Sequence, residues 1–276
     1  MVFAPRGIGK TFFSLGVAYA VSSGGRFLRW QAPNPQGVLF IDGEMPGVVL
    51  QERLARLALS CAEEPQAPLR IITPDLQEKG IIDLAKSEDQ AELSNHLKDV
   101  SLIIIDNLST LVRTGRENDA EGWLPIQAWA LAQRAAGRSV LFIHHSGKGG
   151  SQRGTSRRED VLDTVINFRQ PGDYTPDQGA VFEVHFEKAL GIYGDDTKPF
   201  EAKLLTDSTG RQEWTVLNLE RSTAERLAAL LTDGIPQKEI PEMLGLTKGA
   251  VSKAKKKAKA LGLIMIEGSK FPISRA

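Results

Sequence analysis

The sequence predicts an α/β protein in which helices cover both faces of a mostly parallel sheet, followed by a small helical domain. Three short apolar segments, Val38–Asp42, residues 101–106 and Ser139–His145, have the continuous apolar character of strands buried on both faces. Segments with helical spacing separate them, and this alternation is typical of parallel sheets. After residue 219 only helical patterns follow, so we expect domains at residues 1–219 and 220–276.

Charge is unevenly distributed along a chain that is neutral as a whole. The 276 residues contain 34 Lys and Arg and 34 Asp and Glu. Residues 221–276 contain 11 basic and 5 acidic residues, a net charge of +6, which is typical of a segment that binds a polyanion. Cys61 is the only cysteine, which excludes an intrachain disulfide. No apolar run reaches the ~18 residues of a membrane span, so we expect a cytoplasmic protein with no membrane association.

The remaining elements follow from apolar periodicity and loop-forming residues. We expect strands at Val2–Ala4 and Leu69–Ile72, helices at Lys10–Ser23 and at residues 48–59, 88–97 and 123–136, and edge strands at residues 181–186 and 202–205. Ser87 is placed to cap the helix at 88–97. Residues 31–36 are rich in Pro and Asn, and residues 146–160 in Gly, Ser and Arg, so both are expected to be loops.

A phosphate-binding loop is expected between the first strand and the first helix. Residues 4–11 read Ala-Pro-Arg-Gly-Ile-Gly-Lys-Thr and resemble the Walker A motif, with Ala4 in place of the first glycine. The glycines let backbone N–H groups turn toward phosphate oxygens, and the helix N-terminus adds its dipole. In this motif Lys10 contacts the β- and γ-phosphates of ATP, and the Thr11 hydroxyl binds Mg²⁺. The expected nucleotide-binding residues are Pro5, Arg6, Gly7, Ile8, Gly9, Lys10, Thr11 and Phe12.

Acidic residues end two of the buried strands. Asp106 closes the apolar segment and resembles Walker B, whose carboxylate belongs to the Mg²⁺ shell. Hydrolysis also needs a group that activates water, and Asp42 and Glu44 both stand at the end of Val38–Asp42. RecA-like ATPases resemble this arrangement, because they place the catalytic glutamate after the strand next to the P-loop strand. The resemblance favours Glu44 as the catalytic base, with Asp42 as the competing carboxylate.

The stretch Phe-Ile-His-His-Ser-Gly-Lys-Gly at residues 142–149 looks most like the RepA-type replicative helicases of the AAA_25 family. The resemblance extends from residue 2 to about residue 205 and implies a RecA-like fold. It implies that His145 senses the γ-phosphate; a structural histidine is the alternative. It also implies a homo-oligomeric ring such as a hexamer, in which a basic residue from one subunit completes the neighbouring site. Lys188 fits that position, although the arginine often found close by is absent.

By the same resemblance, two core loops face a central channel that holds single-stranded DNA. These loops would be residues 111–121 and 146–160. The second contains the basic residues Lys148, Arg153, Arg157 and Arg158 among small residues. Such residues suit a flexible electrostatic contact with a phosphate backbone. A solvated loop with incidental charge is the alternative.

The C-terminal residues resemble a helix-turn-helix. Helices are expected at residues 222–231, 237–244 and 248–261, with Pro236 near the first turn of the second, and residues 263–272 would add a short wing. The expected core consists of Ile240, Leu244, Leu246 and Val251. The expected duplex contacts are Lys248, Ser252, Lys253, Lys256 and Lys257. A solvated lysine-rich helix is the alternative.

Together these features predict a motor that hydrolyses ATP with Mg²⁺ and acts on DNA, as plasmid or phage replicative helicases do. A different class, an ATP-switched DNA-binding regulator or loader without unwinding activity, also fits. A small-molecule kinase on the same scaffold would leave the basic tail unexplained.

Overall fold

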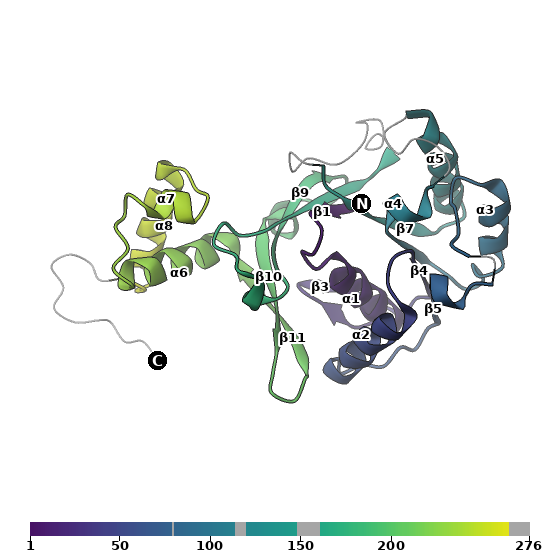
Figure 1. Cartoon of the computed structure of the whole chain (residues 1–276), viewed down its shortest axis with the longest axis horizontal. Helices are drawn as coiled ribbons and strands as arrows, with labels where there is room; N and C mark the ends of the chain where they lie inside the picture. Colours follow the sequence, from purple (N-terminus) through teal and green to yellow (C-terminus); the bar gives the residue numbers. More distant parts are fainter. Residues whose placement is uncertain (79, 114–119, 148–160, 265–276) are drawn as a thin grey trace.

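The computed structural model describes residues 1–78, 80–113, 120–147 and 161–264. In this part of the chain a nine-stranded sheet has the order β11-β10-β9-β8-β1-β7-β6-β4-β5 (Figure 1). Its strands are β1 Val2–Ala4, β4 Val38–Asp42, β5 Leu69–Ile72, β6 Leu102–Asp106, β7 Ser139–His145, β8 Thr164–Arg169, β9 Val181–Ala189, β10 Phe200–Thr206 and β11 Gln212–Asn218. A small second sheet pairs β2 Arg26–Phe27 with β3 Trp30–Gln31.

The six strands from β8 to β5 are parallel, which confirms the predicted α/β class with a mostly parallel sheet. Their register aligns Ala4 with His145 and Asp42 with Asp106. Residues far apart in the sequence therefore meet at one edge of the sheet, where ligands bind in open α/β folds.

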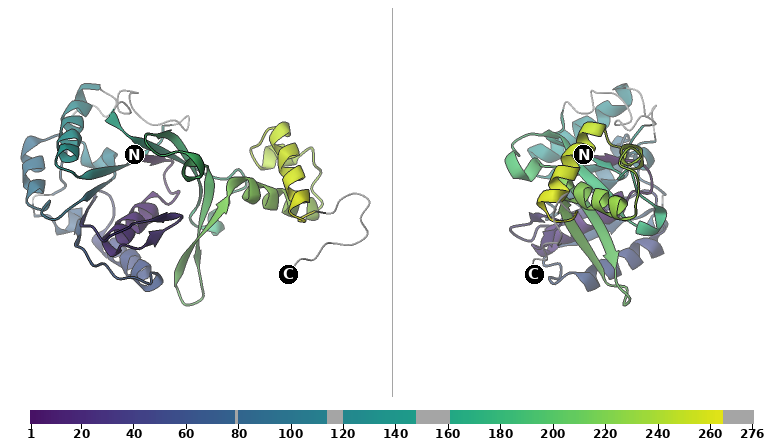
Figure 2. Two further views of the ribbon diagram at one scale, coloured as in Figure 1. Left: turned by 180° about the vertical axis from the view of Figure 1, so that it is seen from behind. Right: turned by 90° about the vertical axis from the view of Figure 1, so that its left-hand side faces the viewer.

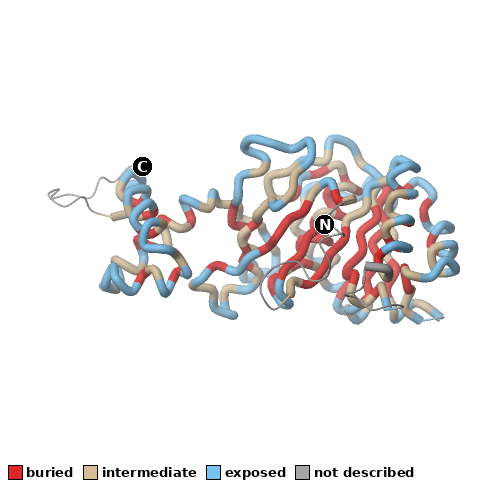
Figure 3. Tube along the Cα trace, turned by 90° about the horizontal axis from the view of Figure 1, so that it is seen from above, coloured by how far each residue is buried: buried red, intermediate tan, exposed pale blue. Residues whose placement is uncertain are grey.

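Helices cover both faces of the sheet. On one face α1 (Lys10–Ser23) and α2 (Gly47–Ser60) pack through residues such as Phe13 and Leu50. On the other face α3 (Ser87–Ser94), α4 (Leu108–Leu111) and α5 (Ala120–Ala135) pack through residues such as Leu93, Leu108 and Trp123. The central strands β1, β4 and β6 of the sheet are almost entirely buried between these layers (Figure 3). These strands are continuous apolar runs of sequence because helices cover both faces of the sheet.

The predicted edge strands are interior strands. Residues 181–186 belong to β9, which pairs with β8 and β10, and residues 202–205 belong to β10, which pairs with β9 and β11. Their antiparallel partners on the outer sides, β8 and β11, are strands that the sequence did not predict. The prediction was wrong because these two additional strands satisfy the backbone groups that edge strands would leave unpaired.

The helix at residues 88–97 also differs from its prediction. Ser87 is its first residue, because the first intrahelical bond runs from Gln90 N to the Lys86 carbonyl, which makes Lys86 the N-cap. The helix ends at Ser94, and tighter turns with i to i+3 bonds follow it. The predicted cap was therefore one residue too late.

Three C-terminal helices form a bundle with a separate apolar core, at one end of the molecule (Figure 2). They are α6 (Leu219–Thr232), α7 (Ile240–Met243) and α8 (Lys248–Ala260). Ile240, Leu244 and Val251 are buried in this core as predicted, and Leu246 packs against it. The second predicted helix is too long, because Glu239 N bonds to the Pro236 carbonyl in a turn that precedes α7. Residues 265–272 of the predicted wing lie outside the described residues.

Arg226 of α6 joins the bundle to the antiparallel strands. Its guanidinium lies 3.5 Å from Asp173, in the β8–β9 connection, and 3.9 Å from Glu183 of β9, and it also contacts Glu201 of β10. The Ser222 hydroxyl donates a 2.7 Å hydrogen bond to the same Glu201. These partners come from three core segments, so a polar cluster fastens α6 to the sheet.

Candidate functional site

The loop between β1 and α1 has the backbone of a phosphate cradle. Gly7 and Gly9 have φ values of 78° and 111°, a region that favours glycine. A Cβ on Gly9 would also lie 3.2 Å from Ala180 Cβ and 3.3 Å from the Phe182 ring. Gly9 is the N-cap of α1 and provides no side chain to occupy the N–H groups of the first turn. These N–H groups and the helix dipole suit an anionic ligand.

Lys10 folds back over this loop. Its ammonium donates hydrogen bonds to the Pro5 carbonyl at 2.7 Å and the Ala4 carbonyl at 3.1 Å. Burial lowers the pKa of Lys10 to about 8, against the attraction of Asp106 and Glu44. A phosphate would offer this partly desolvated cation a stronger partner than two neutral carbonyls.

Asp106 lies at the end of β6, beside the same loop. It is buried, and the Ser14 hydroxyl donates a 2.8 Å hydrogen bond to Oδ2. Burial raises the pKa of Asp106, while hydrogen bonds from Ser14 and Thr11 and the charge of Lys10 act in the opposite direction. One carboxylate next to the Thr11 hydroxyl suits a hard divalent cation that takes its other ligands from phosphate and water. The described residues contain no group of three or more His, Cys, Asp or Glu side chains that could hold a metal ion.

Glu44 and His145 lie close to one another at the carboxyl ends of the parallel strands. Glu44 Oε1 lies 3.5 Å from His145 Nε2; the glutamate side chain is 43% exposed and the histidine 8%. Burial and the nearby charge of Lys10 lower the pKa of His145, so the ring is neutral at pH 7. This contact is therefore a hydrogen bond rather than an ion pair, and the exposed glutamate can reach a ligand or a water molecule.

Asp42 has a different environment. Its Oδ2 accepts hydrogen bonds from the Met45 N–H at 2.7 Å and the Glu44 N–H at 3.2 Å. The side chain is buried, and burial raises its pKa to about 6. Asp42 thus holds the turn that presents Glu44, which makes it a positioning residue in this geometry.

The loop and the strand ends enclose a cavity of about 370 Å³. It is lined by Arg6, Gly7, Gly9, Lys10, Thr11, Phe12, Glu44, Met45, Arg53, Asp106, Asn107 and His145. Of the expected nucleotide-binding residues, Pro5 and Ile8 do not line it: the Pro5 carbonyl binds Lys10, and Ile8 is buried in the apolar core. The structure therefore brings most of the predicted catalytic and nucleotide-binding residues into one cavity.

The sequence analysis assigned no role to Ser14, Arg53 or Asn107. The Arg53 guanidinium lies 4.3 Å from the Phe12 ring centroid and lines the cavity. Ser14 lies one turn after Lys10 on α1, and this helical spacing could have indicated a second hydroxyl facing Asp106. Asn107 follows Asp106 directly, and its side-chain oxygen caps α4 by accepting the Ser109 N–H.

The other predicted site residues that the structure describes do not line this cavity. Lys188 is on β9, opposite Val165, and is not among the residues that line the cavity. The predicted duplex-binding residues Lys248, Ser252, Lys253, Lys256 and Lys257 are all exposed on α8. Lys148, Arg153, Arg157 and Arg158 lie outside the described residues.

Comparison with protein families agrees with this geometry. The AAA_25 family, described as an AAA domain, matches residues 1–151, which is more than half of the 276 residues. The matched segment contains β1 to β7 and all the residues that line the cavity. A comparison with curated proteins finds no match. Among the described residues no helix has the length and apolar character needed to cross a membrane. Because the family match covers most of the α/β core and its P-loop, this chain belongs to the AAA_25 family of P-loop ATPases, which bind nucleotide together with a divalent metal.

Proposed function

We propose that the protein is an ATP-hydrolysing motor that acts on DNA, of the replicative-helicase type. The observation that carries the ATPase part is the convergence of Lys10, Asp106, Glu44 and His145 at one edge of the parallel sheet. A cation on the phosphates, a metal-side carboxylate and an exposed carboxylate that can orient or deprotonate water are groups that phosphoryl transfer to water uses.

The residues have separate roles in this proposal. The N–H groups after Gly9 and the Lys10 ammonium bind the phosphates. Thr11 and Asp106 would hold Mg²⁺, which neutralises charge on the phosphate oxygens when bound. Glu44 accepts a proton from water as the water oxygen bonds to the γ-phosphorus and the bond to the β–γ bridging oxygen breaks, which yields ADP and phosphate. His145, hydrogen-bonded to Glu44, is placed to respond to the γ-phosphate.

The C-terminal bundle supports the DNA part of the proposal. A one-turn α7, a short turn and the lysine-rich α8 follow one another along the chain, and this order supports a helix-turn-helix. Thr247 caps α8, and its side chain accepts the Ala250 N–H at 3.2 Å. From the family resemblance we assign the trans-acting cation of a ring to Lys188, and the single-strand contacts to Lys148, Arg153, Arg157 and Arg158.

A forked-duplex displacement assay tests the motor, with Lys10→Ala as the inactive control. We expect ATP-dependent strand displacement and an ATPase rate that DNA stimulates. Light scattering with ATP and DNA should give the mass of a multimer, and Lys188→Ala should lose activity without losing nucleotide binding. ATPase activity without displacement would instead favour the ATP-switched regulator, a function that the attachment of the bundle through Arg226 also supports.

A further inference from the structure

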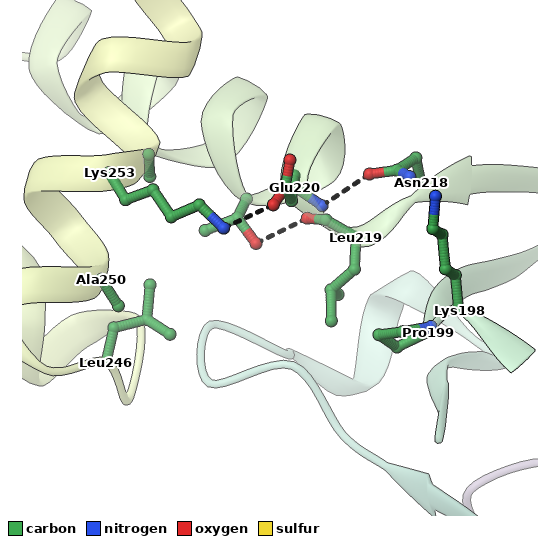
Figure 4. A pocket seen from close by; sticks show the side chains of 10 residues that line it. Lys198, Pro199, Asn218, Leu219, Glu220, Leu246, Ala250 and Lys253 are labelled. Atoms are coloured by element: carbon green, nitrogen blue, oxygen red, sulfur yellow. Dashed lines mark hydrogen bonds and ion pairs between the residues drawn. The ribbon is translucent and has the colours of Figure 1, made fainter. Parts of the chain in front are cut away.

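The six lysines of α8 do not have equivalent surroundings. Lys253 Nζ lies 2.5 Å from Glu220 Oε1 of α6 (Figure 4), and Lys255 Nζ donates to Gln237 Oε1 at 2.6 Å. Lys257 is one turn after Lys253 and, with it, lowers the pKa of Glu220. Lys253 and Lys255 are therefore already engaged within the bundle, and Lys257 lies on the same flank of α8 as Lys253.

The flank that carries Lys253 also faces the α/β core. A mainly apolar cleft of about 410 Å³ lies between α8 and the residues before β10, lined on one side by Ala250 and Lys253 and on the other by Lys198 and Pro199 (Figure 4). A rigid duplex that approached this flank would meet β10 and the start of α6. This side of α8 is therefore poorly accessible to duplex DNA.

A different stripe of α8 points away from the bundle. Lys248, Ser252, Lys256 and Lys259 follow the spacing i, i+4, i+8 and i+11, so they share one face of the helix. Val251, Ala254 and Ala258 lie on the other side and are buried in the bundle core. Lys248, Ser252 and Lys256 are exposed, and Lys259 is half-buried. We name these four residues the outer stripe.

We infer that the outer stripe of α8 is the surface that contacts duplex DNA, an inference that rests on the proposed function. Its first and last lysines, Lys248 and Lys259, are 11 positions apart, about 16 Å of helix, which is comparable to the ~12 Å width of the major groove. Gly249, Ser252 and Ala260 are the small residues of this side and allow the backbone to approach the groove. Lys253, held by Glu220 of α6, and Lys255, held by Gln237 before α7, keep α8 oriented within the bundle.

Other anionic partners fit the outer stripe less well. Single strands are usually held by aromatic side chains on which bases stack, and α8 contains none. A helix that lies on a membrane needs an exposed apolar face, whereas the apolar face of α8 is buried in the bundle.

Two matched variants of the full chain test the inference. Lys256→Gln with Lys259→Gln removes two of the three charges of the outer stripe, and Lys253→Gln with Lys257→Gln removes two charges from the flank, so the two variants are matched in charge. Binding to a fluorescein-labelled duplex of random sequence is measured by anisotropy over a salt series. Each phosphate contact contributes about eightfold at about 0.1 M salt, because affinity scales with salt to the power −0.9 per contact.

The outer-stripe variant should bind the duplex roughly 60-fold more weakly and show a salt slope smaller by about 2. The flank variant should stay within about threefold of wild type. Thermal melting checks that both variants are folded. Equal losses in the two variants, or a larger loss in the flank variant, would overturn the inference. So would wild-type protein that binds only single strands or anionic vesicles. DNA stimulation of the wild-type ATPase reports on the proposed function independently of these outcomes.

Discussion

Replacing Arg226 by alanine should release the C-terminal bundle from the α/β core. The arginine side chain is 19% exposed, and its partners Glu183 and Glu201 are 18% and 9% exposed. Removing one member of a buried ion pair costs about 3–5 kcal/mol, because the remaining charges stay desolvated and unpaired. Here three carboxylates would lose a shared cation, while Glu183 would keep its contact with His185 and Glu201 its hydrogen bond from Ser222. The partial exposure places the expected loss at the lower end, about 3 kcal/mol of attachment free energy.

Hydrogen exchange measured by mass spectrometry can test this value locally. A loss of about 3 kcal/mol should accelerate exchange of α6 amides roughly 100-fold where exchange proceeds by release of the bundle. Amides of β4 and β6 should not change and serve as an internal reference. Arg221→Ala is the matched control, because its pair with Glu225 on the same helix is exposed and worth at most about 1 kcal/mol. If Arg226→Ala accelerates exchange no more than this control, the anchoring argument is wrong.

Three further predictions concern the nucleotide site. Lys10→Ala should abolish ATP hydrolysis and weaken ATP binding, and a turnover near wild type in purified protein would contradict the P-loop assignment. Glu44→Gln should bind ATP but hydrolyse it at least ~100-fold more slowly, while Asp42→Asn should keep more activity; the reverse order in single-turnover assays would exchange the two roles. The pKa of Asp42 is raised to about 6, so between pH 4 and 6 the folded state binds a proton that the unfolded state has lost. The unfolding free energy of the nucleotide-free protein should therefore fall as pH rises through this range, and urea titrations of Asp42→Asn should show a shallower fall.

The sheet and the catalytic edge could be predicted because both depend on local sequence. A strand buried on both faces is a continuous apolar run, and Asp42, Asp106 and His145 each end such a run. In a parallel sheet the ends of these runs must lie at one edge. The same sequence pattern therefore indicated both the fold and the position of the site.

The remaining features depend on partners that are distant in sequence. Ser14 and Asp106 are separated by 92 residues. The position of Ser14 one turn after Lys10 indicates which side of α1 it occupies, but only the folded sheet shows that Asp106 accepts its hydrogen bond. Arg226 reads as one charge on an amphipathic helix, because its partners come from three other segments. β8 and β11 were not predicted because each mixes apolar and polar residues. Polar residues are tolerated there because one side or one end of each strand is not buried. Periodicity indicates which face is buried, but not what covers it.

The β8–β9 connection and the start of β9 link the nucleotide site physically to the bundle. At one end, Ala180 and Phe182 pack so closely against Gly9 that a Cβ there would lie 3.2 Å from Ala180. At the other end, a Cβ on Gly172 would lie 2.3 Å from the Leu244 carbonyl oxygen of the bundle. Asp173, the next residue, binds Arg226. Because packed segments transmit displacement rather than absorb it, a shift of the P-loop and a shift of the bundle act on the same short stretch of chain. The proposed nucleotide site and the proposed DNA-binding bundle therefore both pack against the same segment of the chain. Replacing Arg226 would weaken the contact between the bundle and this segment without changing a residue of either proposed site.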